Sequence, residues 1–332
     1  MSSPRALILG VGGQDGSYLA DILVENGYEV HGIYRHSSLY NLSRIDHLAP
    51  NIHLHAADLT DPLSIVRVLE LCPWDEIYNE ADQDSVGWSR KTPAQTMDIT
   101  ATAVANLFEA IYRARPTAKV FQPCSAHMYG DPAYLPANTP SPQNERTPFN
   151  PQSPYGIAKV AAYHWADYYR RSKGLHIVTG ILYNHDSPRR TEEYLLHKIC
   201  NAAVRIQAGT QQTVALGNLD SRVDVGSARD YMVVAHKLMQ LSTPPDDYVI
   251  GTGTNWCIAD LASRALWHAG VLREPLEYVT RDDEFFYPTP KAFLVADTTK
   301  LIQAIGHKPD GPEKVIRELI DSAIVKQRKG VL

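Results

Sequence analysis

The stretch RALILGVGGQDGSYLADILV, residues 5–24, decides the fold. Its first five residues are an apolar run typical of a buried strand, and its last eight have the apolar spacing of a helix. Gly10, Gly13 and Gly16 stand between them. Such a turn directs bare backbone N–H groups and the positive end of the helix dipole at one point, which suits a pyrophosphate. We therefore expect a dinucleotide-binding unit at the start of the chain.

Strand-like runs and helical patterns continue to alternate along the chain. The strand-like runs cover residues 29–33, 52–56, 76–79, 119–122 and 175–182, and the helical patterns cover residues 61–71, 93–114 and 153–173. Repeated units of this length predict an α/β fold with a doubly wound parallel sheet of the Rossmann type. Ligands of such sheets bind beyond the carboxyl ends of the strands. The residues at or just after those ends include Gly10, Asp58, Asn79 and Ser125.

Tyr155 and Lys159 stand four residues apart in the predicted helix, so they share one face and can point into one cleft. A nearby ammonium lowers the pKa of a phenol and suits it to exchange a proton with a substrate hydroxyl. Ser125, at a neighbouring strand end, can hold the same oxygen in place. The spacing is common, and its plain alternative is an exposed helix face with Tyr155 half-buried. The glycine turn upstream favours a hydride-transfer site instead.

The end of the second predicted strand bears on the choice of dinucleotide. In this kind of fold an acid at that position binds the free 2′-hydroxyl of NAD, whereas an arginine accommodates the 2′-phosphate of NADP. Arg35 is the residue at that position, within the run Tyr34-Arg35-His36. We therefore expect NADP, with NAD as the alternative if Arg35 belongs only to a solvated basic loop.

The character of the chain changes after residue 183. The later segments are shorter and rich in polar residues, proline and tyrosine, although residues 248–250 resemble a strand that returns to the main sheet. We predict an NADP-binding Rossmann domain at 1–183 with a return around 225–252. A smaller C-terminal substrate-binding lobe is expected from 184–224 and 253–332. Prolines at 288 and 290 exclude a regular helix through residues 282–290.

Composition limits the partners. The chain of 332 residues has 37 acidic and 32 basic side chains, a net charge of −5 and no basic run, so nucleic acid is not an expected partner. Apolar stretches are only strand-sized, and a strand begins almost at the N-terminus, so we expect neither a membrane span nor a signal peptide. The 4 cysteines and 13 histidines show no paired or metal-ligand spacing. We expect a cytoplasmic protein without a metal site.

Several motifs resemble the GDP-mannose 4,6-dehydratase family, within the extended short-chain dehydrogenase/reductases that modify nucleotide sugars. The motifs are GQDGSYLA at 13–20, SRIDHL at 43–48, DLTD at 58–61, DEIYN at 75–79, NHDSPRR at 184–190 and LGNLD at 216–220. The resemblance extends from residue 5 to about 231 and continues weakly to the C-terminus. It implies oxidation of a nucleotide-bound hexose at C4.

Site residues follow from the resemblance position by position. It implies NADP contacts from Gly10, Gly13, Gln14, Asp15, Gly16, Arg35, Asp58, Leu59, Lys159, His185 and Arg190. Ser125 occupies the position of the family's catalytic threonine. Asn184 and Lys198 match positions that contact the nucleotide sugar. The family is dimeric or tetrameric, which implies a homodimer or homotetramer packed through the helices at 93–114 and 153–173.

The departures from the family concern elimination of water. His127 stands where the family has the glutamate that serves this step, and either it acts as the base or dehydration has been lost. Residues 79–85 carry three acids where the family has mostly small residues, and one of them, Asp84, is a candidate to replace the missing carboxylate. Its plain alternative is a solvated acidic rim.

Recognition of the nucleotide also differs. Arg222 stands one position before the family's arginine, and Tyr287 and Pro290 correspond loosely to an arginine and a glutamate of the family. The resemblance therefore does not imply guanine specificity, and it leaves open a substrate with a different nucleotide or a different sugar.

Three hypotheses follow. The first is a dehydratase in which Ser125, Tyr155 and Lys159 support oxidation at C4 and His127 or an acid serves elimination. The second is a C4 epimerase or ketoreductase that never eliminates water. The third is a dinucleotide-binding protein without catalysis, against which the intact trio argues.

Overall fold

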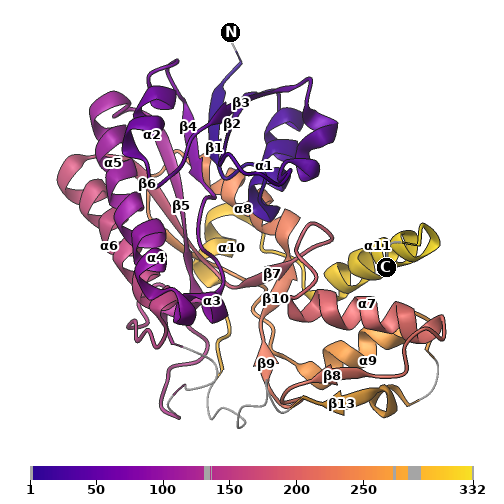
Figure 1. Ribbon diagram of the computed structural model, residues 1–332. Helices are drawn as coiled ribbons and strands as arrows, with labels where there is room; N and C mark the ends of the chain where they lie inside the picture. The colour runs from indigo at the N-terminus through magenta and orange to yellow at the C-terminus, as the bar shows by residue number, and fades with distance from the viewer. Residues whose placement is uncertain (1–2, 131–134, 136, 272–273, 283–292, 331–332) are drawn as a thin grey trace.

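The computed structural model describes residues 3–130, 135, 137–271, 274–282 and 293–330. Its centre is a seven-stranded parallel sheet in the order β11-β6-β5-β4-β1-β2-β3 (Figure 1). Its strands are β1 (Arg5–Leu9), β2 (Glu29–Tyr34), β3 (Ile52–Ala56), β4 (Glu76–Asn79), β5 (Lys119–Ser125), β6 (His176–Leu182) and β11 (Asp247–Ile250). The strand order reverses between β1 and β4. In such a sheet the ligand crevice lies at this point, beyond the carboxyl ends of the strands.

Helices cover both faces of the sheet, because strands buried on both sides need an apolar layer on each. One face packs on α1 (Gln14–Glu25), α8 (Ala228–Met239) and α10 (Thr299–Ile305). The other packs on α2 (Pro62–Leu69), α5 (Ala103–Ala114) and α6 (Pro154–Lys173). The predicted α/β class and the doubly wound parallel sheet are confirmed. The predicted return of residues 248–250 is β11, which pairs with β6 at the edge of the sheet.

A separate apolar cluster joins three helices away from the sheet: α7 (Leu195–Gln207), α9 (Ile258–His268) and α11 (Pro312–Arg328). Short strand pairs flank it: β7 (Asn184–Asp186) with β10 (Val225–Ser227), β8 (Val214–Leu216) with β13 (Val279–Arg281), and β9 (Arg222–Val223) with β12 (Trp256–Cys257). Figure 1 shows these helices and strands below and beside the main sheet. The division into a domain at 1–183 and a lobe from 184–224 and 253–332 stays a prediction.

Two predicted segments need comment. The helix expected at 93–114 is a succession of α4 (Pro93–Met97), a π-helical turn (Asp98–Thr102) and α5, preceded by α3 (Val86–Lys91). Residues 283–292 lie outside the described residues. The expectation for residues 282–290, and the correspondence of Tyr287 and Pro290, fall there.

Candidate active site

The glycine turn between β1 and α1 is tightly enclosed. Gly10 has φ +79°, and a Cβ on it would lie 2.7 Å from the carbonyl oxygen of Glu80. A Cβ on Gly16 would collide with the Gly10 carbonyl. Helix α1 then begins after Gly13, which supplies no side-chain cap. The first N–H groups of α1 therefore remain available to an anion.

Asp15, in the first turn of α1, is paired with His185 from β7. Asp15 Oδ2 lies 2.9 Å from His185 Nε2, and His185 Nδ1 lies 2.8 Å from the Tyr183 carbonyl oxygen. Burial raises the pKa of Asp15, but the imidazole outweighs it and the net shift is downward. Burial lowers the pKa of His185, but Asp15 outweighs it and the net shift is upward. The two directions agree on an ion pair that links α1 to β7.

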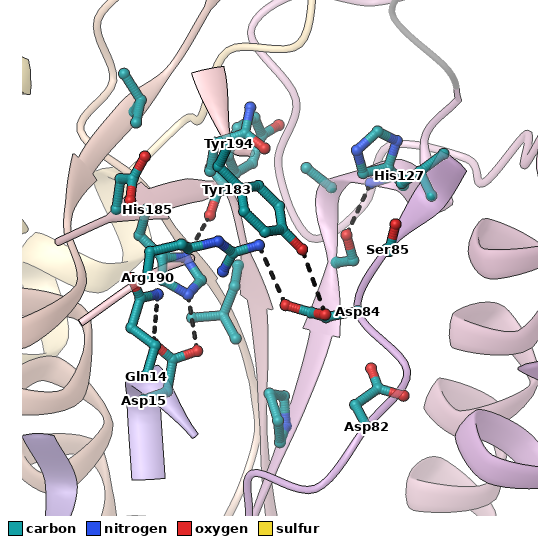
Figure 2. Close-up of a pocket in the computed structure, with 18 of the residues that line it drawn as sticks. Gln14, Asp15, Asp82, Asp84, Ser85, His127, Tyr183, His185, Arg190 and Tyr194 are labelled. Carbon is teal, nitrogen blue, oxygen red and sulfur yellow. Dashed lines mark hydrogen bonds and ion pairs between the residues drawn. The ribbon is translucent and has the colours of Figure 1, made fainter. Parts of the chain in front are cut away.

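A cavity of about 560 Å³ lies at the carboxyl ends of β1, β4 and β5. Gly13, Gln14 and Asp15 line one end, and Ser125, Tyr155 and Lys159 line another part of the wall. Asn184, His185 and Arg190 line it from the segment that begins with β7 (Figure 2). The structure thus brings together the glycine turn, the Ser-Tyr-Lys trio and the Asn-His-Asp-Ser-Pro-Arg-Arg motif.

Tyr155 and Lys159 reach the cavity from the first two turns of α6. Ser153 caps this helix by accepting a hydrogen bond from Gly156 N at 3.1 Å. Gly156 lets the helix lie against the loop after β5, since a Cβ there would lie 2.6 Å from the His127 carbonyl oxygen. Tyr155 and Lys159 are buried, and Lys159 Nζ lies 5.7 Å from the centroid of the Tyr155 ring.

The charges around Tyr155 differ from the expectation based on Lys159 alone. Burial raises the pKa of Tyr155, Lys159 lowers it, and Asp82 and Asp84 raise it, so that the net shift is upward despite a hydrogen bond from Ser125. Burial lowers the pKa of Lys159, yet Asp82 and Tyr155 more than compensate. In the absence of a ligand, Tyr155 is therefore a neutral phenol and Lys159 is protonated.

Three acids in the loop after β4 account for much of this electrostatic environment. Asp82 Oδ2 lies 2.7 Å from Lys159 Nζ, which also donates to the Pro123 carbonyl oxygen at 2.9 Å. Asp84 Oδ2 lies 3.1 Å from Arg190 Nη2 (Figure 2). Glu80 lines the cavity between these groups and the glycine turn. Of the three, only Asp84 has a role predicted from the sequence; the ion pairs of Asp82 and Asp84 both form between distant parts of the chain.

His127 lies beside Ser125 and Tyr155. It belongs to a single 3₁₀ turn (Ala126–Met128) after β5, and its backbone N–H donates to Ser125 Oγ at 3.2 Å. The centroid of its ring is 6.0 Å from that of Tyr155, and the two rings meet edge to face. The side chain lines the cavity and is partly exposed. His127 is thus placed to face whatever substrate reaches Tyr155.

Other candidates from the sequence lie apart from the cavity wall. Arg35 is exposed beyond β2, and Asp58 and Leu59 follow β3. Lys198 lies 3.7 Å from Asp282, and Arg222 donates to the Asn255 carbonyl oxygen at 3.1 Å. None of these five is among the described residues that line the cavity. Their proposed contacts with the cofactor or substrate remain predictions.

One histidine cluster was not anticipated. Glu29, His31 and His53, on β2 and β3, place possible ligand atoms within 4.8 Å of one another. The rings of His31 and His53 are stacked, however, with centroids 4.6 Å apart and planes at 29°. Both ring nitrogens of His31 already have partners, because Nδ1 lies 2.9 Å from His55 Nε2 and Nε2 lies 3.2 Å from Glu29 Oε1. We propose no metal site there.

Comparison with known proteins places this site in a family. The family model for GDP-mannose 4,6 dehydratase matches residues 7–319. GDP-mannose 4,6 dehydratase 2 of Arabidopsis thaliana is 38% identical over 341 residues, covering 98% of this chain and 89% of that protein. The human GDP-mannose 4,6 dehydratase is 35% identical over 356 residues, covering 99% and 94%.

Solved structures agree on the fold. A dTDP-glucose 4,6-dehydratase from Bacillus anthracis, in complex with NAD, superimposes with a TM-score of 0.83 at 15% identity and covers 99% of this chain and 100% of that one. A UDP-glucose 4-epimerase from Thermotoga maritima gives 0.82 at 21% identity, with the same coverage. None of the helices in the described part of the chain combines the length and apolar character that crossing a bilayer requires. The family match and the sequence identities together show that this chain belongs to the GDP-mannose 4,6-dehydratase family.

Proposed function

We propose that this protein is an NADP-dependent enzyme that oxidises a nucleotide-bound hexose at C4 through Ser125, Tyr155 and Lys159. The observation that carries the proposal is that Tyr155 and Lys159, both buried, line the same cavity as Gly13 of the glycine turn. A proton-transfer group and a candidate dinucleotide cradle that line one cavity support this proposal. Relatives named for the same class of chemistry support the substrate class.

The cradle fits a dinucleotide. Cβ atoms on Gly10 and Gly16 would intrude on backbone, and the uncapped start of α1 offers N–H groups to a pyrophosphate. Arg35, exposed at the end of β2, supports NADP over NAD by pairing with a 2′-phosphate. A solved structure of RMD from Pseudomonas aeruginosa, complexed with NADPH, has this fold with a TM-score of 0.79 at 19% identity, covering 98% of this chain and 100% of that one.

Each residue of the trio has a distinct task. Tyr155 would first lose its own proton to solvent, and Lys159 would stabilise the phenolate; this phenolate would then accept the proton of the C4 hydroxyl while Ser125 holds the same oxygen. When bound, NADP would supply a nicotinamide ring that can accept hydride from C4 and donate it back. Because Asp82 holds Lys159 beside Tyr155, the ammonium is already in place before the substrate arrives.

For elimination, the structure favours His127 over Asp84 as the base. The ring of His127 packs edge to face against that of Tyr155, whereas Asp84 is paired with Arg190 and approached by Tyr194 at 3.5 Å. His127 would remove the C5 proton once C4 is a ketone, the C6 hydroxyl would take a proton from the imidazolium so formed and leave as water, and hydride would return to C6. The alternative is a C4 epimerase or ketoreductase, in which the ketone is reduced again without loss of water.

A panel of nucleotide sugars incubated with the protein and NADP separates these functions. Loss of water supports dehydration, and inversion at C4 without change of mass supports epimerisation. Tyr155→Phe should reduce either activity by about 10²–10⁴-fold, the usual contribution of general acid–base catalysis, while it still binds NADPH. If no sugar reacts and Tyr155→Phe preserves function in cells, the non-catalytic alternative holds.

A further inference from the structure

Glu80 lies where a bound dinucleotide has to pass. It follows β4 directly, and its backbone carbonyl is packed against Gly10 at the turn into α1. Its side chain lines the cavity, and its carboxyl group interacts electrostatically with both Asp15 and Lys159. Glu80 therefore lies between the glycine turn and the hydride-transfer trio.

Three other acids of the cavity have cationic partners. Asp15 pairs with His185, Asp82 with Lys159, and Asp84 with Arg190. Glu80 Oε1 is buried and makes no hydrogen bond within the described part of the chain. A buried, unsatisfied carboxylate is costly, but a neutral carboxylic acid costs less and offers one O–H donor.

A dinucleotide changes the environment of this side chain. Its pyrophosphate is anionic and would approach the start of α1, and its nicotinamide ribose would approach Lys159. An ionised Glu80 would repel the phosphates, whereas a protonated Glu80 could donate to a phosphate or ribose oxygen. The same side chain is thus either an obstacle or a ligand, according to its protonation.

We propose that Glu80 binds the dinucleotide as a neutral carboxylic acid that donates a hydrogen bond, so that binding of the dinucleotide is coupled to retention of this proton. This inference rests on the proposed function, because it needs a dinucleotide in the cavity. It assigns to Glu80 a role that the sequence did not indicate.

The charges around Glu80 agree with this role. Burial and Asp15 raise its pKa, Lys159 lowers it and Asp82 raises it, which gives a value of about 8. The acid is thus mostly neutral at pH 7 and ionises as the pH rises through 8. His185 also titrates with a raised pKa, and Lys159 and Tyr155 face the same cavity. The pH profile of the wild type alone is therefore insufficient, and isosteric variants are needed.

The test measures the Kd for NADPH by fluorescence titration between pH 6.5 and 9.5. If only the neutral acid binds, the wild-type Kd should rise by about tenfold between pH 7 and pH 9, since one proton is linked to binding. Glu80→Gln, which is always neutral and still donates, should lose this rise. Glu80→Leu should also lose this rise, but it should bind NADPH more weakly than Glu80→Gln at every pH, because leucine donates no hydrogen bond. Asp84→Asn removes another negative charge from the cavity and should keep the rise.

Each outcome decides a separate point. If Glu80→Gln and the wild type share one pH profile, the role of Glu80 is overturned while the proposed function stands. If neither protein binds NADPH or NADH at any pH, although both unfold cooperatively at the same temperature, the dinucleotide site and the role of Glu80 both fail. Calorimetric titration in two buffers of different ionisation enthalpy gives a second measure: at pH 8.5 the wild type should take up a proton on binding and Glu80→Gln should not.

Discussion

At Tyr155, neighbouring charges act in opposite directions. Lys159 favours the phenolate, while burial, Asp82 and Asp84 favour the phenol. Lys159 in turn is held by Asp82 and by the Pro123 carbonyl oxygen. Deprotonation of the Tyr155 phenol is therefore opposed by burial and by two carboxylates, Asp82 and Asp84, and is favoured by Lys159.

Removing the Asp82 carboxylate should shift the pH dependence of catalysis. In Asp82→Asn the charge that raises the pKa of Tyr155 is lost, so the acidic limb of the profile of kcat/KM should move to lower pH. The variant should also lose stability, by about 3 kcal/mol, because Lys159 is left buried without its ion-pair partner. The control is Asp167→Asn. Asp167 lies on α6, as Tyr155 and Lys159 do, and pairs with Arg171 at 2.6 Å near the surface, so this variant should change neither the acidic limb nor the stability. An unaltered acidic limb in Asp82→Asn would show that Asp82 does not influence Tyr155.

His127 can be tested independently of the redox trio. His127→Ala should abolish loss of water and spare hydride transfer, measured as formation of NADPH absorbance in a single turnover. His127→Glu should restore elimination, since it places a carboxylate at the position where the family has one. Dehydration at the wild-type rate in His127→Ala would contradict the assignment of this residue as the base.

At the scale of elements, the turn between β1 and α1 depends on the absence of side chains. Gly16→Ala places a Cβ against the Gly10 carbonyl, so the start of α1 must move away from the pyrophosphate site. We predict a loss of about 1–3 kcal/mol in the free energy of unfolding, typical of overpacking, together with weakened binding of NADPH. Thermal unfolding and fluorescence titration measure these effects.

The matched control is Gly311→Ala at the start of α11. A Cβ there would meet only Thr254 Oγ1, at 3.9 Å. Its unfolding temperature should stay close to that of the wild type, with unchanged NADPH binding. Equal behaviour of the two variants would mean that the turn tolerates a side chain and that its glycines are not required for the cradle.

Elements of this fold could be predicted because their signals are local. Apolar periodicity located the helices that became α2 and α6 within a few residues, and the glycine spacing located the turn before α1. The strand-end rule for such sheets predicted the place of Ser125, and the spacing of four residues on one helix predicted that Tyr155 and Lys159 share a face. The partners of the acids could not be predicted in the same way. Asp82 contacts Lys159 and Asp84 contacts Arg190 only in the folded chain. The sequence therefore could not predict that the pKa of Tyr155 is raised rather than lowered.

At the scale of the whole molecule, the outer face of α5 and α6 carries large apolar side chains. Tyr112, Ile157, Trp165 and Tyr168 are 36%, 49%, 40% and 43% exposed. An exposed aromatic surface of this kind is typical of an interaction site, and the sequence predicts a second copy of the chain as its partner. We therefore predict a homodimer that packs through α5 and α6.

Trp165→Glu should convert this dimer to a monomer, because it places a charge in an apolar interface. Trp267→Glu, on α9 and 61% exposed, should leave the dimer intact. Light scattering after size-exclusion chromatography gives both masses. A wild type that is monomeric at high concentration, or a dimer that survives Trp165→Glu, would contradict the assignment of this face.

The most direct test of oxidation at C4 uses one set of reactions in D₂O. The wild type and Tyr155→Phe are incubated with NADP and a panel of nucleotide sugars, and the products are followed by mass spectrometry and NMR. We predict that the wild type converts at least one nucleotide sugar through a ketone at C4, with loss of water and deuterium at C5 if His127 acts as base, and that Tyr155→Phe does not. A wild type that binds NADPH but leaves every sugar unchanged, or a Tyr155→Phe variant as active as the wild type, would contradict the proposal.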